Sequence, residues 1–318
     1  MSKLSDRNGR AYEYAYLLKL EEKVKPYRKI AIENNSSLVV LQNAWNEIGE
    51  EMRKMFLISA DAGVTAILEV EPLIAENADD VLEIKIQPDD AGKKGDVRDI
   101  VLTRKNISWE IGFSVKNNHA AAKHSRLSRK LDFGEKWFGL PCSQDYWNDI
   151  KPIFDYLSEE KVKKTKWRDL PNKDTEVYVP LLKAFLKELK KGYEIHGEVL
   201  PTRMVEYILG KFDFYKAIGK NRIRITQIQP YNLRGTLNKA SKERKPKIIL
   251  PVTELPTRIV GAEFKPDSTT TVELYMDKGW QFALRIHSAE TNVIPSLKFD
   301  VQIIGMPATI ICIDCKWE

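Results

Sequence analysis

The 318-residue sequence contains only three cysteines, too few for a disulfide framework, which favours a reducing compartment. No run of roughly eighteen apolar residues occurs, so the sequence predicts no transmembrane helix. The first ten residues, MSKLSDRNGR, are polar and lack the apolar segment of a signal peptide. Glycine and proline number 16 and 15, far fewer than in fibrous or low-complexity chains. We therefore expect a globular protein of the cytoplasm.

Several short catalytic motifs are also absent. The chain has no GxxxxGK[ST], HExxH or GxSxG sequence, which argues against P-loop ATPase, zincin and α/β-hydrolase chemistry. Cys312 and Cys315 have the spacing of a zinc-ligand pair, but no second Cys or His pair accompanies them. They also lie in an apolar segment, so we interpret them as core thiols.

The charge is unevenly distributed, although the net charge is only +6. Residues 33–90 are strongly acidic, which is typical of a solvated surface. Residues 161–191 and 222–247 are strongly basic and are interleaved with aromatic residues. Basic stretches of this kind favour a polyanionic partner, bound mainly through its phosphates.

The periodic segments predict helices first and strands later. Helical spacing of apolar residues predicts two N-terminal helices, over residues 5–25 and 38–57. Alternation then predicts a meander of three short strands that ends in ISWEIGFSVK, residues 107–116. A helix is expected over AAAKHSRLSRKL, residues 120–131, and further helices follow. From about residue 222 the chain becomes strand-rich, so we predict a mixed α/β (α+β) fold with a loose boundary near residue 220. The β-rich part is either a second domain or an extension of the same sheet.

The third predicted strand has one apolar and one polar face. Ser114 and Lys116 lie on the polar face, and an antiparallel hairpin would bring Asp99 beside them. A carboxylate next to a lysine suits a metal-dependent phosphodiesterase, because the acid binds a divalent cation and the lysine offsets phosphate charge. Asp96, in the preceding turn, is a second possible carboxylate. An ordinary cross-strand ion pair is the alternative explanation.

Four segments resemble the HaeIII-type family of type II restriction endonucleases, within the PD-(D/E)XK nuclease superfamily. They are NGRAYEYAYL, GDVRDIVLTR, WEIGFSVKNNHAAAKHSRLS and DKGWQFALRIHSAETNVIPSLKFD. The resemblance implies a central mixed sheet flanked by helices. With the loose boundary near residue 220, we expect a catalytic nuclease core over residues 1–220 and a β-rich DNA-recognition part over residues 221–318. It also implies Mg²⁺-dependent cleavage of double-stranded DNA at GGCC, between G and C, with blunt ends. A homodimer is compatible with the sequence.

Ser114 departs from the superfamily pattern, which places an acid two residues before the lysine. The resemblance therefore implies that another carboxylate replaces it. The catalytic candidates beside Asp99, Lys116 and Ser114 are Glu13, Asp132 and Glu135, and the candidate metal ligands are Asp99, Asp96 and Glu110. Glu110 would need a bend in its strand, since four residues separate it from Ser114.

Two groups of residues are expected to contact DNA. The first follows the predicted catalytic strand and would approach phosphates: Asn117, His119, Lys123, His124 and Arg126. The second lies in the β-rich part and would read guanine, or else only touch phosphates: Arg222, Arg224, Arg234, Arg285 and His287.

Two other functions are compatible with the sequence. A structure-directed repair or junction nuclease would share the catalytic residues, but it would not need the long β-rich part. A DNA-binding protein without catalytic activity is the second alternative, and Ser114 in place of the acid is its best argument.

Overall fold

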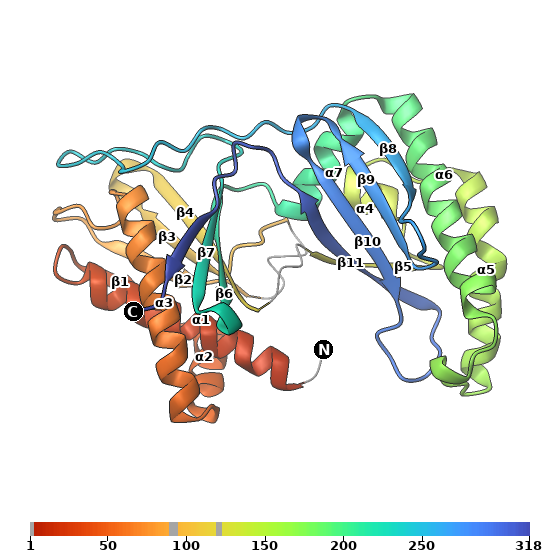
Figure 1. Cartoon of the computed structure of the whole chain (residues 1–318), viewed down its shortest axis with the longest axis horizontal. Coiled ribbons are helices and arrows are strands. Elements are labelled where there is room, and N and C mark those ends of the chain that lie inside the picture. Colours follow the sequence, from red (N-terminus) through yellow and green to blue (C-terminus); the bar gives the residue numbers. More distant parts are fainter. Residues whose placement is uncertain (1–2, 89–94, 119–122) are drawn as a thin grey trace. The chain divides into compact units, whose positions relative to one another are not determined.

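The structure of the chain is a computed structural model with two compact units, which we describe separately (Figure 1). The described residues are 3–88, 95–118 and 123–318. Unit 1 comprises residues 1–120, 211–253 and 308–318, and unit 2 comprises residues 121–210 and 254–307. Each unit combines one sheet with its own helices, so the mixed α/β class predicted from the sequence is confirmed.

Unit 1 is built on a seven-stranded mixed sheet with the strand order β1-β2-β3-β4-β6-β7-β12. β1 pairs with β2, and β4 with β6, in parallel, whereas the other neighbours are antiparallel. The strands are β1 (Ile30–Ile32), β2 (Leu82–Ile86), β3 (Ile100–Arg104), β4 (Trp109–Asn117), β6 (Phe214–Lys220), β7 (Ile225–Tyr231) and β12 (Ile313–Lys316). The chain therefore leaves this sheet after β4 and returns to it twice.

Helices cover one face of the unit 1 sheet (Figure 1). They are α1 (Lys3–Val24), α2 (Ser36–Glu47) and α3 (Glu50–Val70). α1 packs against β4, α3 packs against β6, β7 and β12, and α2 packs against α1. Ile111, Phe113 and Val115 alternate along β4 and are buried in the core of this unit. The alternate residues of β4, which include Ser114 and Lys116, therefore lie on the opposite, polar face.

Unit 2 is built on a five-stranded antiparallel sheet with the order β5-β11-β10-β9-β8. The strands are β5 (Lys123–Ser128), β8 (Ile259–Phe264), β9 (Thr271–Met276), β10 (Gln281–His287) and β11 (Ser296–Gly305). Its helices are α4 (Phe133–Phe138), α5 (Gln144–Val162), α6 (Val179–His196) and α7 (Val199–Leu209). Phe299 of β11 packs against Trp137 and Phe185, with ring centroids 6.0 and 5.2 Å apart, so one face of the sheet is buried against helices.

Short helical turns connect several of these elements. The 3₁₀ turns are η2 (Lys105–Ile107), η3 (Trp167–Asp169), η5 (Asn221–Ile223) and η6 (Asp277–Gly279), and η4 (Asp174–Tyr178) is a π-helix. Within the described ranges, no helix is both long and apolar enough to span a bilayer.

The prediction of a helix over residues 120–131 was wrong. Its described part forms strand β5, which pairs with β11 at the edge of the unit 2 sheet, and residues 119–122 lie outside the described residues. Ser125 and Leu127 are buried while Arg126 between them is exposed, which is the period of a strand. Pairing with β11 and burial of Leu127 outweigh the helix propensity of the alanine- and lysine-rich sequence.

The expected boundary near residue 220 does not coincide with the division of the structure. Residues 211–253 belong to unit 1, because β6 pairs with β4 and β7 pairs with β6. Residues 254–307 belong to unit 2, whose sheet also takes β5 from the middle of the chain. The strand-rich C-terminal part is therefore shared between two sheets.

Candidate active site and DNA-contacting residues

Asp99 and Lys116 meet at the end of the β3–β4 hairpin. The Asp99 N–H donates to the Phe113 carbonyl at 2.7 Å, which sets the register of the two strands. The Asp99 carboxylate then accepts hydrogen bonds from the Val115 N–H at 2.7 Å and from Lys116 Nζ at 2.9 Å. The predicted convergence of Asp99 and Lys116 across the hairpin is therefore confirmed.

This pair is open to a ligand. The side chains of Asp99 and Lys116 are 21% and 30% exposed. Both hydrogen bonds fall on Oδ2 of Asp99, and Oδ1 accepts none from the residues that the structure describes. A carboxylate oxygen in this position can bind a hard divalent cation, and the adjacent ammonium group can bind a phosphate oxygen.

Lys216 of β6 belongs to the same site, although we did not predict it from the sequence. The parallel register of β4 and β6 places Lys216 directly beside Ser114. Lys216 is only 5% exposed. Burial, and then the charge of Lys116, lower the pKa of Lys216 to about 8, while the charge of Asp99 opposes the shift. A lysine between Tyr215 and Ala217, in an otherwise apolar strand, was the signal that could have identified it.

The charges of the site fit a divalent cation only in part. Ser114 is buried and contributes no carboxylate. Asp99 is the acid that binds Lys116 in the described part of the chain, and Mg²⁺ is usually bound through one or two carboxylates together with substrate phosphates. Across the described parts of the chain, no group of three or more His, Cys, Asp or Glu residues could hold a metal ion. Binding of Mg²⁺ here would therefore depend on phosphate oxygens or on a further acid.

Asp96 and Glu110 are engaged by Arg98, a residue that the sequence did not single out. Arg98 donates to both oxygens of Asp96 at 2.8 Å, and to Oε1 of Glu110 at 2.8 Å. Its side chain lies over Gly112, where a Cβ atom would come within 2.2 Å of the Arg98 Cδ. The two expected metal ligands thus form a salt-bridge cluster, and Glu110 stays beside Thr103 without the bend that metal binding would require.

The three other acids have different environments. Asp132 caps α4 and accepts hydrogen bonds from the backbone N–H groups of Glu135 and Cys142. Glu135 is exposed in the first turn of the same helix, and both residues belong to unit 2. Glu13 is half-buried on α1, in the unit that carries Asp99, and it also has an interaction partner. Asp132 follows strand β5, and not the helix that the sequence predicted.

The expected DNA-contacting residues of unit 1 gather around the end of β4. Asn117 accepts a hydrogen bond from the Asn221 side chain at 3.1 Å, which joins β4 to the turn between β6 and β7. Arg222 and Arg224 are exposed in and directly after this turn. The Arg224 guanidinium also lies 5.6 Å from the centre of the Trp317 ring.

The expected residues of unit 2 share the polar face of its sheet. Arg285 is paired with Asp300, and His287 with Lys298, across β10 and β11. Lys298 in turn lies beside Arg126 of β5. His287 Nε2 is 2.9 Å from Asp300 Oδ2. This face therefore carries a cluster of basic residues around one carboxylate.

The structure gives no DNA-facing position for two histidines and one lysine of the first predicted group. His119 and the side chain of His124 lie outside the described part of the structure. The Lys123 ammonium donates to the Tyr207 carbonyl at 2.5 Å and lies 3.8 Å from the centre of the Tyr207 ring. Burial lowers the pKa of Lys123 to about 8, with a smaller contribution from Lys136. Lys123 thus has an internal partner in unit 2.

The carboxylate–lysine pair, in a basic chain with exposed arginines, suits an enzyme that cleaves the DNA backbone. The sequence matches the family model of the HaeIII restriction endonuclease over residues 9–307. It is 52% identical to the type II restriction enzyme HaeIII of Haemophilus aegyptius over 318 residues, which cover 100% of both chains. No solved structure matches. The chain belongs to the HaeIII restriction endonuclease family and is a type II site-specific deoxyribonuclease, which confirms the resemblance found in the sequence.

Proposed function

We propose that this enzyme hydrolyses double-stranded DNA at GGCC, between G and C, with Mg²⁺ as cofactor and blunt ends as product. The hydrogen bond between Asp99 and Lys116 carries the proposal for the chemistry, because it joins a cation ligand to a phosphate ligand. The 52% identity to HaeIII over the whole chain supports the choice of recognition sequence.

Each residue of the site has a separate role in this reaction. Asp99 would hold Mg²⁺, and the ion, when bound, would neutralise phosphate charge and acidify a water molecule. Lys116 binds a nonbridging oxygen of the scissile phosphate and positions the Asp99 carboxylate through its hydrogen bond. Lys216, beside Ser114, adds a second positive charge next to the same phosphate. The two lysines thereby stabilise the charge that develops during hydrolysis.

A second carboxylate completes the site. Glu13 is the first choice, because it is half-buried and belongs to the unit that carries Asp99 and Lys116. Glu135 is the second choice, because its side chain is exposed. Asp132 ranks below both, since its two oxygens already accept backbone hydrogen bonds in the cap of α4. Asp96 and Glu110 rank lowest while they are paired with Arg98.

The polar face of the unit 2 sheet reads the DNA sequence, and the turn after β6 contacts phosphates. Arg285 is exposed in this face. Arginine binds guanine O6 and N7 in two hydrogen bonds, which suits a site made only of G·C pairs. Because GGCC is palindromic, two copies of the chain related by a twofold axis would cut both strands.

Incubation of the purified protein with plasmid DNA, with Mg²⁺ or with EDTA, tests the proposal. We expect discrete fragments only with Mg²⁺, and sequenced ends that read GG at one side and CC at the other. Discrete fragments with other ends would reject GGCC. Nicking that depends on DNA structure would indicate the repair nuclease, and intact DNA with a gel shift would indicate a binding protein without catalysis.

A further inference from the structure

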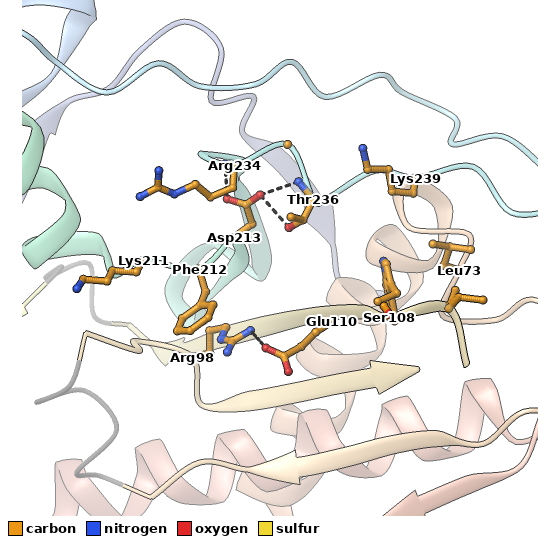
Figure 2. A pocket seen from close by; sticks show the side chains of 13 residues that line it. Leu73, Arg98, Ser108, Glu110, Lys211, Phe212, Asp213, Arg234, Thr236 and Lys239 are labelled. Atoms are coloured by element: carbon orange, nitrogen blue, oxygen red, sulfur yellow. Dashed lines mark hydrogen bonds and ion pairs between the residues drawn. The ribbon is translucent and has the colours of Figure 1, made fainter. Parts of the chain in front are cut away.

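Unit 1 contains a pocket of about 580 Å³ on the polar side of β4 (Figure 2). Glu110 and Arg98 form one wall, and the segments around Phe212 and Arg234 form the other. Glu110 and Ser114 lie on the same face of β4, four residues apart, which is roughly 13 Å along a strand. The pocket is therefore a neighbour of the Asp99–Lys116 pair and does not contain it.

The mouth of this pocket is basic. Lys211, Arg234 and Lys239 line it and are exposed. The two acids of the lining have internal partners, since Glu110 binds Arg98 and Asp213 binds the backbone. The charge presented to a ligand is therefore positive.

Asp213 holds one wall of the pocket in place. It is buried, and it accepts hydrogen bonds at 2.8 Å from the Arg234 N–H, the Thr236 N–H and the Thr236 hydroxyl. Figure 2 shows these contacts in the turn that carries Arg234. The turn passes through Gly235 with φ +74°, a conformation that favours glycine. The turn is thus preorganised, which lowers the entropic cost of binding a ligand.

Phe212 gives the pocket an apolar surface among these charges. It is 45% exposed, and the Arg98 guanidinium lies 4.1 Å from the centre of its ring. An exposed aromatic ring between cations matches an extended ligand with alternating anionic and apolar groups. The phosphates and deoxyriboses of a DNA strand have this pattern.

We propose that this pocket binds the sugar–phosphate backbone of the substrate outside the recognition sequence. The proposal rests on the proposed DNA substrate. For DNA that runs along β4, roughly 13 Å corresponds to about four phosphates at 3.4 Å per step along the helix axis. A cut in the middle of GGCC leaves two base pairs on each side, so the contacted phosphates belong to flanking DNA. Lys211, Arg234 and Lys239 bind the phosphates, and Phe212 packs against the deoxyribose.

Binding assays with duplexes of two lengths test this assignment. Both duplexes contain the sequence that the wild-type enzyme cuts, one with two and one with ten flanking base pairs on each side, and Ca²⁺ replaces Mg²⁺. We expect the triple variant Lys211→Ala, Arg234→Ala, Lys239→Ala to bind the long duplex at least about tenfold more weakly at moderate salt, with a salt slope smaller by about 2–3. Its binding of the short duplex should change less than about twofold.

Controls separate this proposal from its alternatives. Lys54→Ala removes an exposed cation of α3 and should change neither duplex. The variant Lys211→Arg, Arg234→Lys, Lys239→Arg keeps the three positive charges and should bind the long duplex as the wild type does. Thermal melting checks that each variant is folded. Equal losses on both duplexes, or no loss, would overturn the assignment. A further probe is 2-aminopurine placed in the flanking DNA. If its fluorescence rises when the wild-type enzyme binds, and this rise is smaller with the triple variant, the pocket holds a base and the assignment is overturned. If the wild-type enzyme cuts nothing, the proposed function fails, and random-sequence duplexes of the two lengths still test the pocket.

Discussion

Lys116 Nζ lies 2.9 Å from Asp99 Oδ2, and this oxygen also accepts the Val115 N–H at 2.7 Å. The register of one hairpin, in which Ile100 is paired with Phe113, fixes the positions of this ammonium, this carboxylate and this backbone N–H. The site is thus preorganised by backbone pairing, and substitution of either side chain should alter chemistry more than folding.

Asp99→Asn should abolish cleavage and leave DNA binding intact. The amide keeps the shape of the side chain but removes the negative charge that holds a divalent cation, so we expect a loss of at least about 100-fold in cleavage rate. Plasmid cleavage with Mg²⁺ and gel shifts with Ca²⁺ measure the two properties. Glu50→Gln removes an exposed carboxylate of α3 and should cut normally. Full activity in Asp99→Asn would remove Asp99 from the site.

Lys216→Met should slow cleavage while the protein stays folded. Methionine fills a similar volume without a charge that must be desolvated, so we expect a melting temperature close to that of the wild type. We expect the single-turnover rate at saturating DNA to fall by about tenfold or more. Lys216→Arg keeps the charge and should recover part of the rate. A loss of stability that parallels the loss of activity, without recovery by arginine, would indicate a structural lysine.

Single alanine substitutions should identify the carboxylate that replaces the acid missing at position 114, where this chain has Ser114. Glu13→Ala is expected to abolish DNA cleavage. Glu135→Ala is expected to abolish it if unit 2 supplies the second carboxylate. Asp132→Ala should mainly destabilise α4, by about 1 kcal/mol, because it removes a helix cap. Ser114→Glu in the inactive variant should restore some cutting in a plasmid assay. Normal cutting by all three alanine variants and by Glu110→Ala would leave a site with one carboxylate.

The hairpin was predictable from the sequence because its information is local. Alternation from Trp109 to Lys116 fixes which residues face the core, and the short turn fixes the pairing with β3. Lys216 could not be placed in the same way, because β6 joins β4 only after the chain has passed through unit 2. Strand β5 was missed for the same reason, since its partner β11 lies far along the sequence. Arg98 was missed because its partners depend on the open space above Gly112.

Glu71 should make the stability of the protein depend on pH. Burial raises its pKa from about 4.5 to about 7, although hydrogen bonds from the Asn238 N–H and the Tyr215 hydroxyl oppose the shift. Between these values the folded protein keeps a proton that the unfolded chain has released. Stability should therefore fall as the pH rises through this window, by on the order of 3 kcal/mol in total.

Urea denaturation between pH 4.5 and 8 measures this effect. Glu71→Gln is neutral at every pH, so its midpoint should vary much less than that of the wild type. Glu50→Gln alters an exposed acid and should retain the wild-type dependence. An unchanged pH dependence in Glu71→Gln would show that other groups cause it.

Arg285→Ala should weaken binding to the cognate sequence more than binding to other DNA. Arg285 is exposed in the polar face of the unit 2 sheet, beside Asp300. An arginine that binds guanine in two hydrogen bonds contributes about 1–3 kcal/mol of discrimination, which corresponds to roughly 5–150-fold in affinity. Binding in Ca²⁺ to the cognate duplex, and to one with a single G·C pair replaced by A·T, measures the ratio. A uniform loss on both duplexes, with a salt slope reduced by about 1, would mean that Arg285 binds a phosphate. Lys265→Ala, which removes an exposed cation directly after β8, is the matched control and should preserve the ratio.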